Sequence, residues 1–207
     1  MNADIILTKI LTLPGIILGL SFHEFAHAWV SDRLGDPTPR RDGRVTINPL
    51  AHIDWIGFAA LLLVGFGWGK PVRIDPRYYK NRRRDEFLVA IAGVTMNLII
   101  AAVLSIPARI MMKHYAATAP SELMYNVYLI IFYAISINVV LMVFNLLPVP
   151  PLDGWNIVTQ LFKLDRYDWW YKVYQYGTYI LLALIIFNVT DLVLTPLVSA
   201  VMKILLY

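Results

Sequence analysis

The sequence contains no cysteine in its 207 residues. Disulfides and thiolate-bound metals are therefore excluded, and any metal must be held by histidine or carboxylate side chains. These groups are also scarce, because the chain has only four His and 14 Asp and Glu residues. Charged residues make up 15% of the chain, against about 25% in an average soluble domain. So low a charge content excludes an ordinary water-soluble globule.

Hydrophobic residues are abundant, at 58% of the chain, and the mean hydropathy is +0.60. A helix needs about 20 apolar residues to cross a bilayer. Runs of sufficient length are Ile5–Val30, Phe87–Met112 and Leu123–Leu147. A last run, Gly177–Leu206, is interrupted by Asn188, Asp191 and Pro196, and is either one kinked span or a broken one. The sequence thus predicts an all-α polytopic membrane protein with a core of three helices and one or more C-terminal helices.

Other segments are too short or too polar to span a membrane. Trp55–Trp68 is apolar but only 14 residues long, with basic segments on both sides, which predicts a re-entrant loop. The turn signal Asp42-Gly43 precedes the alternating stretch Arg44–Ile47, which predicts a short membrane-associated β-hairpin or sheet. Asn156–Tyr176, with its aromatic residues, is typical of a helix at the membrane interface.

The basic residues indicate the orientation of the chain. Eleven of the 18 Lys and Arg residues lie between Arg33 and Arg84. The positive-inside rule places this region in the cytoplasm, so Leu147–Asp153 returns to the side of the membrane where the first span ended at His27. We therefore expect a multi-pass protein of a prokaryotic cytoplasmic membrane, with its site toward the cytoplasm.

A single domain is expected over residues 1–207, with a catalytic core at about 7–160 and an interfacial helix and membrane segment over 161–207. Because the cations cluster between apolar runs and not on a soluble domain, the lipid bilayer is an expected partner and nucleic acid is not. The sequence does not indicate an oligomeric state.

The end of the first span carries an H-E-x-x-H pattern, His23-Glu24-Phe25-Ala26-His27. Residues i and i+4 of a helix lie on one face, so both imidazoles can bind one Zn²⁺ while Glu24 faces a metal-bound water. Ionisable residues in an apolar helix are costly without a function. The alternative, a pair of structural histidines bonded to backbone carbonyls, is the weaker interpretation.

A catalytic zinc ion usually has three protein ligands, so a third ligand is expected. Asp153 is favoured, because the preceding prolines break the helix and such a backbone is tolerated at membrane depth only where it faces protein or water. Its alternative role is that of a helix cap. The other candidates for the third ligand are His52, Asp191 and His114.

Three motifs on three spans resemble those of the site-2 protease family of intramembrane zinc metalloproteases, peptidase family M50. They are His23–His27, Gly93–Asn97 and Asn145–Gly154. The resemblance implies a zinc ion held by His23, His27 and Asp153, with Glu24 as general base. It also implies cleavage of a transmembrane protein substrate inside the bilayer. No PDZ or CBS segment is present in this sequence, which resembles the minimal form of the family.

Hydrolysis at such a site needs a proton carrier and a stabiliser of the oxyanion. Glu24 takes the proton of the water and passes it to the leaving nitrogen. Asn145, at the end of the third span, and Asn97, on the second, are candidate donors to the oxyanion. For each of these asparagines the alternative is a structural hydrogen bond between helices.

The region between the first two spans holds further candidates. His52 precedes the predicted re-entrant loop and is a gate, a proton relay, a fourth metal ligand, or only a histidine that bonds its own loop. The extended residues Val72, Arg73 and Ile74 are a candidate edge to which an unwound substrate adds as a strand.

Two other functions compete with proteolysis. Buried His and Asp residues also mark ion paths, so a metal-binding membrane transporter is the first rival. A non-catalytic membrane scaffold is the second, although a scaffold has no need of Glu24 together with all three metal ligands.

Overall fold

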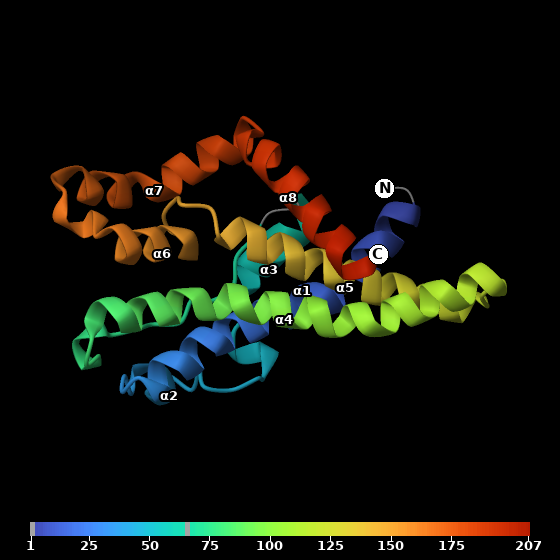
Figure 1. Cartoon of the computed structure of the whole chain (residues 1–207), viewed down its shortest axis with the longest axis horizontal. Helices are drawn as coiled ribbons and strands as arrows, with labels where there is room; N and C mark the ends of the chain where they lie inside the picture. Colours follow the sequence, from blue (N-terminus) through green and yellow to red (C-terminus); the bar gives the residue numbers. More distant parts are fainter. Residues whose placement is uncertain (1–2, 65–66) are drawn as a thin grey trace.

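The computed structural model describes residues 3–64 and 67–207, which form a bundle of helices joined by loops (Figure 1). The α-helices are α1 (Ala3–Arg33), α2 (Thr38–Arg41), α3 (Trp55–Val64), α4 (Arg82–Ala117), α5 (Glu122–Asn145), α6 (Asp153–Phe162), α7 (Asp168–Ile186) and α8 (Val189–Leu206). Three 3₁₀ turns are η1 (Pro49–Ala51), η2 (Pro76–Tyr78) and η3 (Leu164–Arg166).

The helices α1, α4 and α5 pack against one another and form the centre of the bundle. Small residues allow the close approach, since a Cβ atom added to Gly15 of α1 would lie 2.6 Å from the Cα atom of Ala134 in α5. The buried side chains between α4 and α5 are mostly apolar and include Val94, Ala101, Ile135 and Val139. The predicted three-helix core is therefore present.

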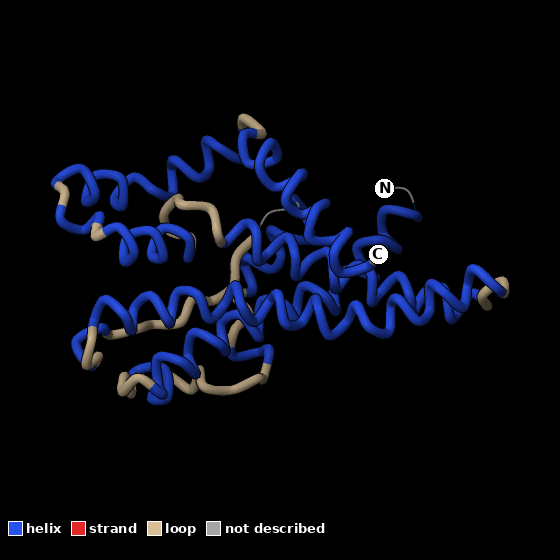
Figure 2. The backbone as a smooth tube through the Cα atoms, in the orientation of Figure 1, coloured by secondary structure: helices blue, strands red, loops and turns tan. Residues whose placement is uncertain are grey.

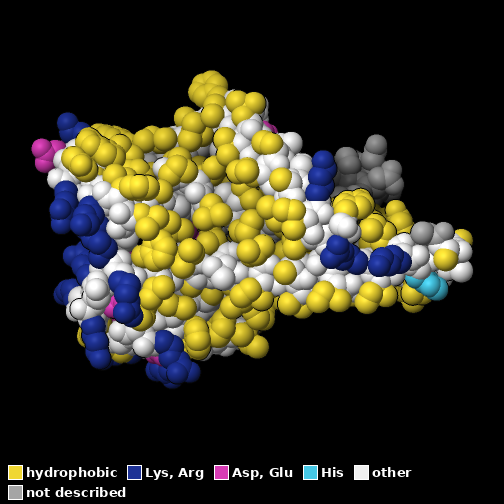
Figure 3. Space-filling model, in the orientation of Figure 1, with side chains coloured by type: hydrophobic (Ala, Val, Ile, Leu, Met, Phe, Trp, Pro, Cys, Tyr) yellow, Lys and Arg dark blue, Asp and Glu magenta, His cyan; other side chains and the backbone are white. Residues whose placement is uncertain are grey.

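Four of the described helices are long and apolar enough to cross a membrane, namely Leu7–Arg33, Arg82–Tyr115, Glu122–Asn145 and Val189–Leu206. The surface agrees with this arrangement. Lys and Arg side chains gather at one end of the molecule, apolar side chains cover its middle, and a smaller group of cations lies toward the other end (Figure 3). The chain is a multi-pass membrane protein.

The predicted re-entrant segment contains α3, which has only ten residues. After α3 the chain comes back to the start of this helix, as the position of Trp68 shows: a Cβ atom on Gly57 would overlap the Trp68 backbone oxygen. The two ends of the segment therefore lie close together, and re-entry from one side of the membrane stays a prediction. Residues 65–66, within that predicted loop, lie outside the described part of the chain.

The predicted β-hairpin is wrong for the described residues, which contain helices and loops but no strand (Figure 2). The backbone groups that a ladder would use bond to side chains instead. The Arg44 guanidinium donates to the carbonyl oxygens of Lys70 and Pro71, and the Thr46 carbonyl faces His52 Nε2 at 2.7 Å. Side-chain hydrogen bonds, and not the backbone pairing of a sheet, thus connect Arg44–Ile47 to the segments around it.

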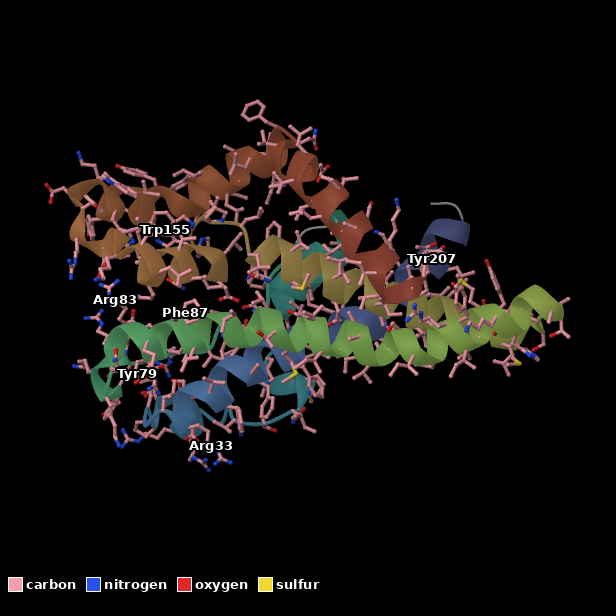
Figure 4. The ribbon with its side chains drawn as sticks, viewed as in Figure 1. Arg33, Tyr79, Arg83, Phe87, Trp155 and Tyr207 are labelled. Carbon is pink, nitrogen blue, oxygen red and sulfur yellow. The ribbon has the colours of Figure 1, made fainter. Side chains whose placement is uncertain are left out.

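The predicted interfacial helix Asn156–Tyr176 is divided between α6 and α7, because Lys163 adopts the left-handed conformation (φ 56°, ψ 42°). A second left-handed residue, Asn188, divides the last apolar run into α7 and α8, so this run is broken. Trp155 of α6 stacks on Trp170 of α7 and lies on the side of α6 that faces α7 (Figure 4). This stacking joins α7 to α6, whereas α6 packs on α4, and α8 packs on α4 and α5.

Candidate metal centre

Three side chains of the types that bind metals, which could together hold one ion, meet between α1 and α6. His23 and His27 lie on consecutive turns of α1, and their Nε2 atoms are 3.0 Å apart. Each of these nitrogens lies 3.2 Å from Asp153 Oδ2. Asp153 reaches them because the prolines after Asn145 end α5, and α6 begins at Asp153 itself. The helix spacing and the broken backbone thus produce one three-residue cluster.

The hydrogen bonds at the other ring nitrogens determine the tautomers of both histidines. His27 Nδ1 lies 2.7 Å from the Val89 carbonyl oxygen, which can only accept, so Nδ1 carries the proton. His23 Nδ1 lies 2.7 Å from Asn97 Oδ1. The Asn97 amide nitrogen donates elsewhere, which leaves Oδ1 to accept from His23. In the neutral form of each ring, Nε2 is therefore the nitrogen whose lone pair is directed at the centre.

The Asp153 carboxylate completes an acceptor-only cluster. Its Oδ2 atom is buried and has no hydrogen-bond donor. Two imidazole lone pairs and a carboxylate at such distances repel one another unless a cation lies between them. Two histidines and one aspartate are a donor set that suits catalytic Zn²⁺ and leaves its fourth position open.

Gly93 of α4 lies against this cluster. A Cβ atom added to Gly93 would lie 2.5 Å from His27 Nε2 and 2.7 Å from His23 Nε2. Gly93 begins the second of the three motifs, Gly93–Asn97. The structure shows that its missing side chain leaves space at the metal-binding nitrogens.

A cavity of about 520 Å³ opens beside the metal-binding atoms, and Glu24 and Asn145 contribute to its wall together with the three metal-binding residues. Glu24 Oε2 accepts a hydrogen bond of 3.0 Å from the Val72 backbone N–H. The Asn145 amide nitrogen donates to Leu141 O at 3.0 Å within its own helix. The carboxylate and the amide predicted for catalysis therefore share one space with the metal ligands.

Asn97 does not fit the oxyanion role that it shares with Asn145 in the sequence interpretation. Its side chain is fully buried, and its amide nitrogen donates to Gly19 O at 3.1 Å and to Asn138 Oδ1 at 3.0 Å. Its oxygen accepts from His23. Asn97 is therefore a positioning residue that orients His23, in the manner of the groups that orient metal ligands from outside the coordination sphere.

His52 lies apart from the metal-binding atoms. The group that can hold a metal among the described residues contains His23, His27 and Asp153, without His52, Asp191 or His114. The His52 side chain is fully buried, and its Nε2 faces the Thr46 carbonyl. Burial lowers the pKa of His52, so the ring is neutral at pH 7. The structure thus favours the loop-bonding interpretation over a fourth metal ligand.

The candidate edge at residues 72–74 has no strand structure. The Val72 N–H donates to Glu24 and is not free to pair with a substrate strand, which removes Val72 from that role. No hydrogen bond from the N–H of Arg73 or Ile74 is present among the described residues. Of these two residues, Ile74 contributes to the wall of the cavity.

Two functional residues escaped sequence reasoning. Asn138 supports Asn97, and its position in an otherwise apolar span was a signal for such a role. The Val89 carbonyl orients His27, but no side-chain pattern marks a backbone group of this kind.

Comparisons with known proteins agree with this site. Residues 109–188 match the sequence profile of Peptidase family M50. The chain is 34% identical over 185 residues to "Putative zinc metalloprotease YwhC" of Bacillus subtilis, which covers 89% of this chain and 84% of that protein. It is 29% identical over 153 residues to "Putative zinc metalloprotease Rip2" of Mycolicibacterium smegmatis, covering 71% of this chain and 55% of that protein. No solved structure matches the chain significantly. The chain therefore belongs to peptidase family M50, the site-2 protease family of zinc metalloproteases.

Proposed function

We propose that this protein is an intramembrane zinc endopeptidase that hydrolyses peptide bonds within the transmembrane segments of membrane-protein substrates. The observation that carries the proposal is the convergence of two imidazole nitrogens and a carboxylate in a cavity whose wall includes Glu24, on helices that span or adjoin the membrane. The ligands are His23, His27 and Asp153. The expected setting is a prokaryotic cytoplasmic membrane, with the cavity toward the cytoplasm.

Glu24 is the proton carrier of the proposed reaction. Bound zinc would polarise the scissile carbonyl and acidify a water molecule. Glu24 Oε2 is held by the Val72 N–H, while among the described residues no second hydrogen bond to the carboxylate is present. The other oxygen is available to accept the proton of the attacking water and to deliver it to the leaving nitrogen. The polar cavity beside it provides space for that water within an apolar bundle.

Asn145 is the proposed donor to the oxyanion that develops on the scissile carbonyl. Its amide lies in the wall of the same cavity and is bonded only to the preceding turn of its own helix. Rotation of this side chain exchanges a hydrogen bond to Leu141 for one to the substrate. A donor placed in advance at a developing charge contributes most to catalysis where water is excluded.

A substrate helix must unwind before its amide reaches the metal, and an extended chain needs hydrogen-bond partners. Arg73 and Ile74 offer their backbone groups as that edge. Replacement of Ile74 by proline should raise KM and leave the zinc content unchanged. An unchanged KM would contradict the proposal that the substrate pairs with the backbone of Arg73 and Ile74.

The proposed function is tested with protein reconstituted in vesicles and a peptide that contains one transmembrane segment. Glu24→Gln should retain one zinc per chain and lower the cleavage rate by about 10²- to 10⁴-fold, the usual contribution of a general base. Glu122→Gln, an exposed change at the start of α5, is the matched control and should cleave at the wild-type rate. Cleavage by Glu24→Gln at the wild-type rate, or metal flux without cleavage by the wild type, would contradict the proposal.

A further inference from the structure

The carboxylate of Glu24 is held by a segment from outside its own helix. Besides the hydrogen bond from Val72, a Cβ atom on Gly69 would lie 3.9 Å from Glu24 Oε1. The backbone of residues 69–72 therefore passes directly beside the carboxylate. The contacts that fix residues 69–72 therefore also fix the position of the Glu24 carboxylate in the cavity wall.

Arg44 holds the two residues that precede Val72. Its guanidinium donates to the carbonyl oxygens of Lys70 and Pro71, the second at 3.1 Å. The Lys70 N–H donates to the His52 carbonyl oxygen at 2.8 Å. The side chain of His52 is in turn bonded to the loop that carries Arg44, through the carbonyl of Thr46. These bonds fasten Lys70 and Pro71 from two directions.

The cost of burying Arg44 indicates that its contacts are specific. Arg44 is only 4% exposed, and among the described residues it forms no ion pair. Its Nη1 atom is buried without a hydrogen-bond partner. A buried cation that forms no ion pair is disfavoured by desolvation, and burial accordingly lowers the pKa of Arg44. An apolar side chain would fill this space at lower cost, so packing alone does not account for an arginine here.

The shape of the guanidinium gives the physical reason for arginine. Its planar fork presents donors in a rigid arrangement, whereas the ammonium of lysine is a point charge on a flexible chain. Both hydrogen bonds leave from Nη2, whose two N–H bonds are fixed in the guanidinium plane. One rigidly held nitrogen thus binds the carbonyls of two consecutive residues and restricts the rotation of both peptide planes. The Pro71 carbonyl belongs to the same peptide unit as the Val72 N–H. Arg44 therefore controls the direction in which that N–H points.

We infer that Arg44 is a positioning residue for the reaction proposed above: by binding the carbonyls of Lys70 and Pro71, it directs the Val72 N–H onto one oxygen of Glu24. This inference rests on the proposed function of Glu24 as general base. Arg44 acts through the backbone of residues 70–72 and touches neither the metal-binding atoms nor the substrate. Its loss should consequently impair the chemical step and not the binding of zinc.

Arg44→Lys tests the inference, because it keeps the charge and removes the planar guanidinium that fixes the direction of the two donors. We expect kcat to fall about 10- to 100-fold, the effect typical of losing an orienting partner at a catalytic site. KM should stay within about twofold of the wild-type value, and one zinc per chain should be retained. Arg40→Lys is the matched control, since Arg40 is exposed and pairs with Asp32 on the surface. It should match the wild type.

Val72→Pro removes the N–H itself and gives a second, independent test. It should lower kcat as Arg44→Lys does, and the double variant should lose no more than Val72→Pro alone, because both changes break one chain of contacts. Full additivity would overturn the inference, as would a normal kcat in Arg44→Lys. Loss of zinc in parallel with kcat would show that Arg44 supports the fold and not Glu24.

Hydrogen–deuterium exchange separates this inference from the proposed function, because it requires no activity. In the wild type the amides of Lys70 and Val72 are hydrogen-bonded, so a peptide covering residues 69–75 should exchange slowly there. In Arg44→Lys these amides should exchange at least about tenfold faster, and in Arg40→Lys they should not change. Equal exchange in the wild type and Arg44→Lys overturns the role of Arg44. A wild type that cleaves nothing overturns the proposed function instead.

Discussion

At the scale of single residues, the lack of a side chain at Gly93 matters for the proposed metal site as much as the side chains that would bind the metal. Gly93 lies where a methyl group would meet both metal-binding nitrogens. Gly93→Ala should therefore displace the imidazoles and lower the zinc affinity at least about tenfold. Zinc content after dialysis against a weak chelator measures this effect. Leu98→Ala, at an exposed position of the same helix, is the control, and equal zinc retention by both variants would contradict the account.

His52 makes stability depend on pH. Burial lowers its pKa below the ordinary 6.5, and Arg44 acts in the same direction, whereas Thr46 O and Glu24 partly oppose the shift. Between the two pKa values the unfolded chain binds more protons than the folded one, so stability falls as the pH drops below about 6.5.

The unfolding midpoint of His52→Gln should therefore change less than that of the wild type between pH 7 and pH 5, because the variant lacks this titrating group. His114→Gln, which removes an exposed histidine at the end of α4, serves as the control and should follow the wild type. Identical pH profiles for His52→Gln and the wild type would refute the prediction.

The sequence was sufficient to predict which residues form the cluster, but not what each asparagine does. The spacing of His23 and His27 on a helix determines that they share a face. Asn97 and Asn145 are chemically the same, and only their partners distinguish an amide that orients His23 from one that lines the cavity. Those partners lie far away in sequence, so no local pattern could identify them.

At the scale of the elements, the C-terminal region is shaped by two left-handed residues, Lys163 and Asn188. The left-handed conformation costs an ordinary residue roughly 1–2 kcal/mol, and glycine avoids that cost at some entropic expense. Lys163→Gly should therefore raise the free energy of unfolding by about 0.5–1 kcal/mol. Reversible denaturation in detergent measures the change.

The control for this prediction is the same substitution inside a helix. Lys172→Gly, in the exposed part of α7, should lower the free energy of unfolding by about 1 kcal/mol. If both variants lose stability equally, the strain assigned to Lys163 is absent.

The elements that sequence reasoning missed share one physical cause. Apolar length predicted the long helices correctly, because that signal is local and strong. The expected strand at Arg44–Ile47 and the single helix over Asn156–Tyr176 depended on what distant groups would do. The Arg44 side chain is buried against the carbonyls of Lys70 and Pro71, and the left-handed Lys163 ends α6. Patterns of period 2 or 3.6 in the sequence reveal neither contact nor helix end of this kind.

At the scale of the whole molecule, the length of α4 bears on how deep in the bilayer the proposed metal centre lies. Its 36 residues extend about 54 Å at 1.5 Å per residue, which exceeds the roughly 30 Å of a hydrocarbon core. In the proposed intramembrane placement, the hydrocarbon core begins near Phe87, where the apolar part of α4 starts, and Gly93 lies about 9 Å inside it. A site at such depth needs a polar cavity to supply water, and the bundle has one there.

The proposed orientation is open to direct mapping, because a chain without cysteine gives no background labelling. Lys80→Cys lies before α4 and Ala119→Cys after it, both at exposed positions. An impermeant maleimide should label Ala119→Cys in intact cells and Lys80→Cys only after lysis. The reverse pattern would contradict a cavity that faces the cytoplasm.

The central claim is that one zinc ion, held by His23, His27 and Asp153, makes this membrane protein a protease. The most direct measurement is the cleavage rate of a transmembrane peptide by metal-free protein in vesicles as zinc is returned. The account predicts no cleavage without metal and a rate that rises to a plateau at one zinc per chain. Cleavage that persists after the metal is removed, or that no amount of zinc restores, would contradict it.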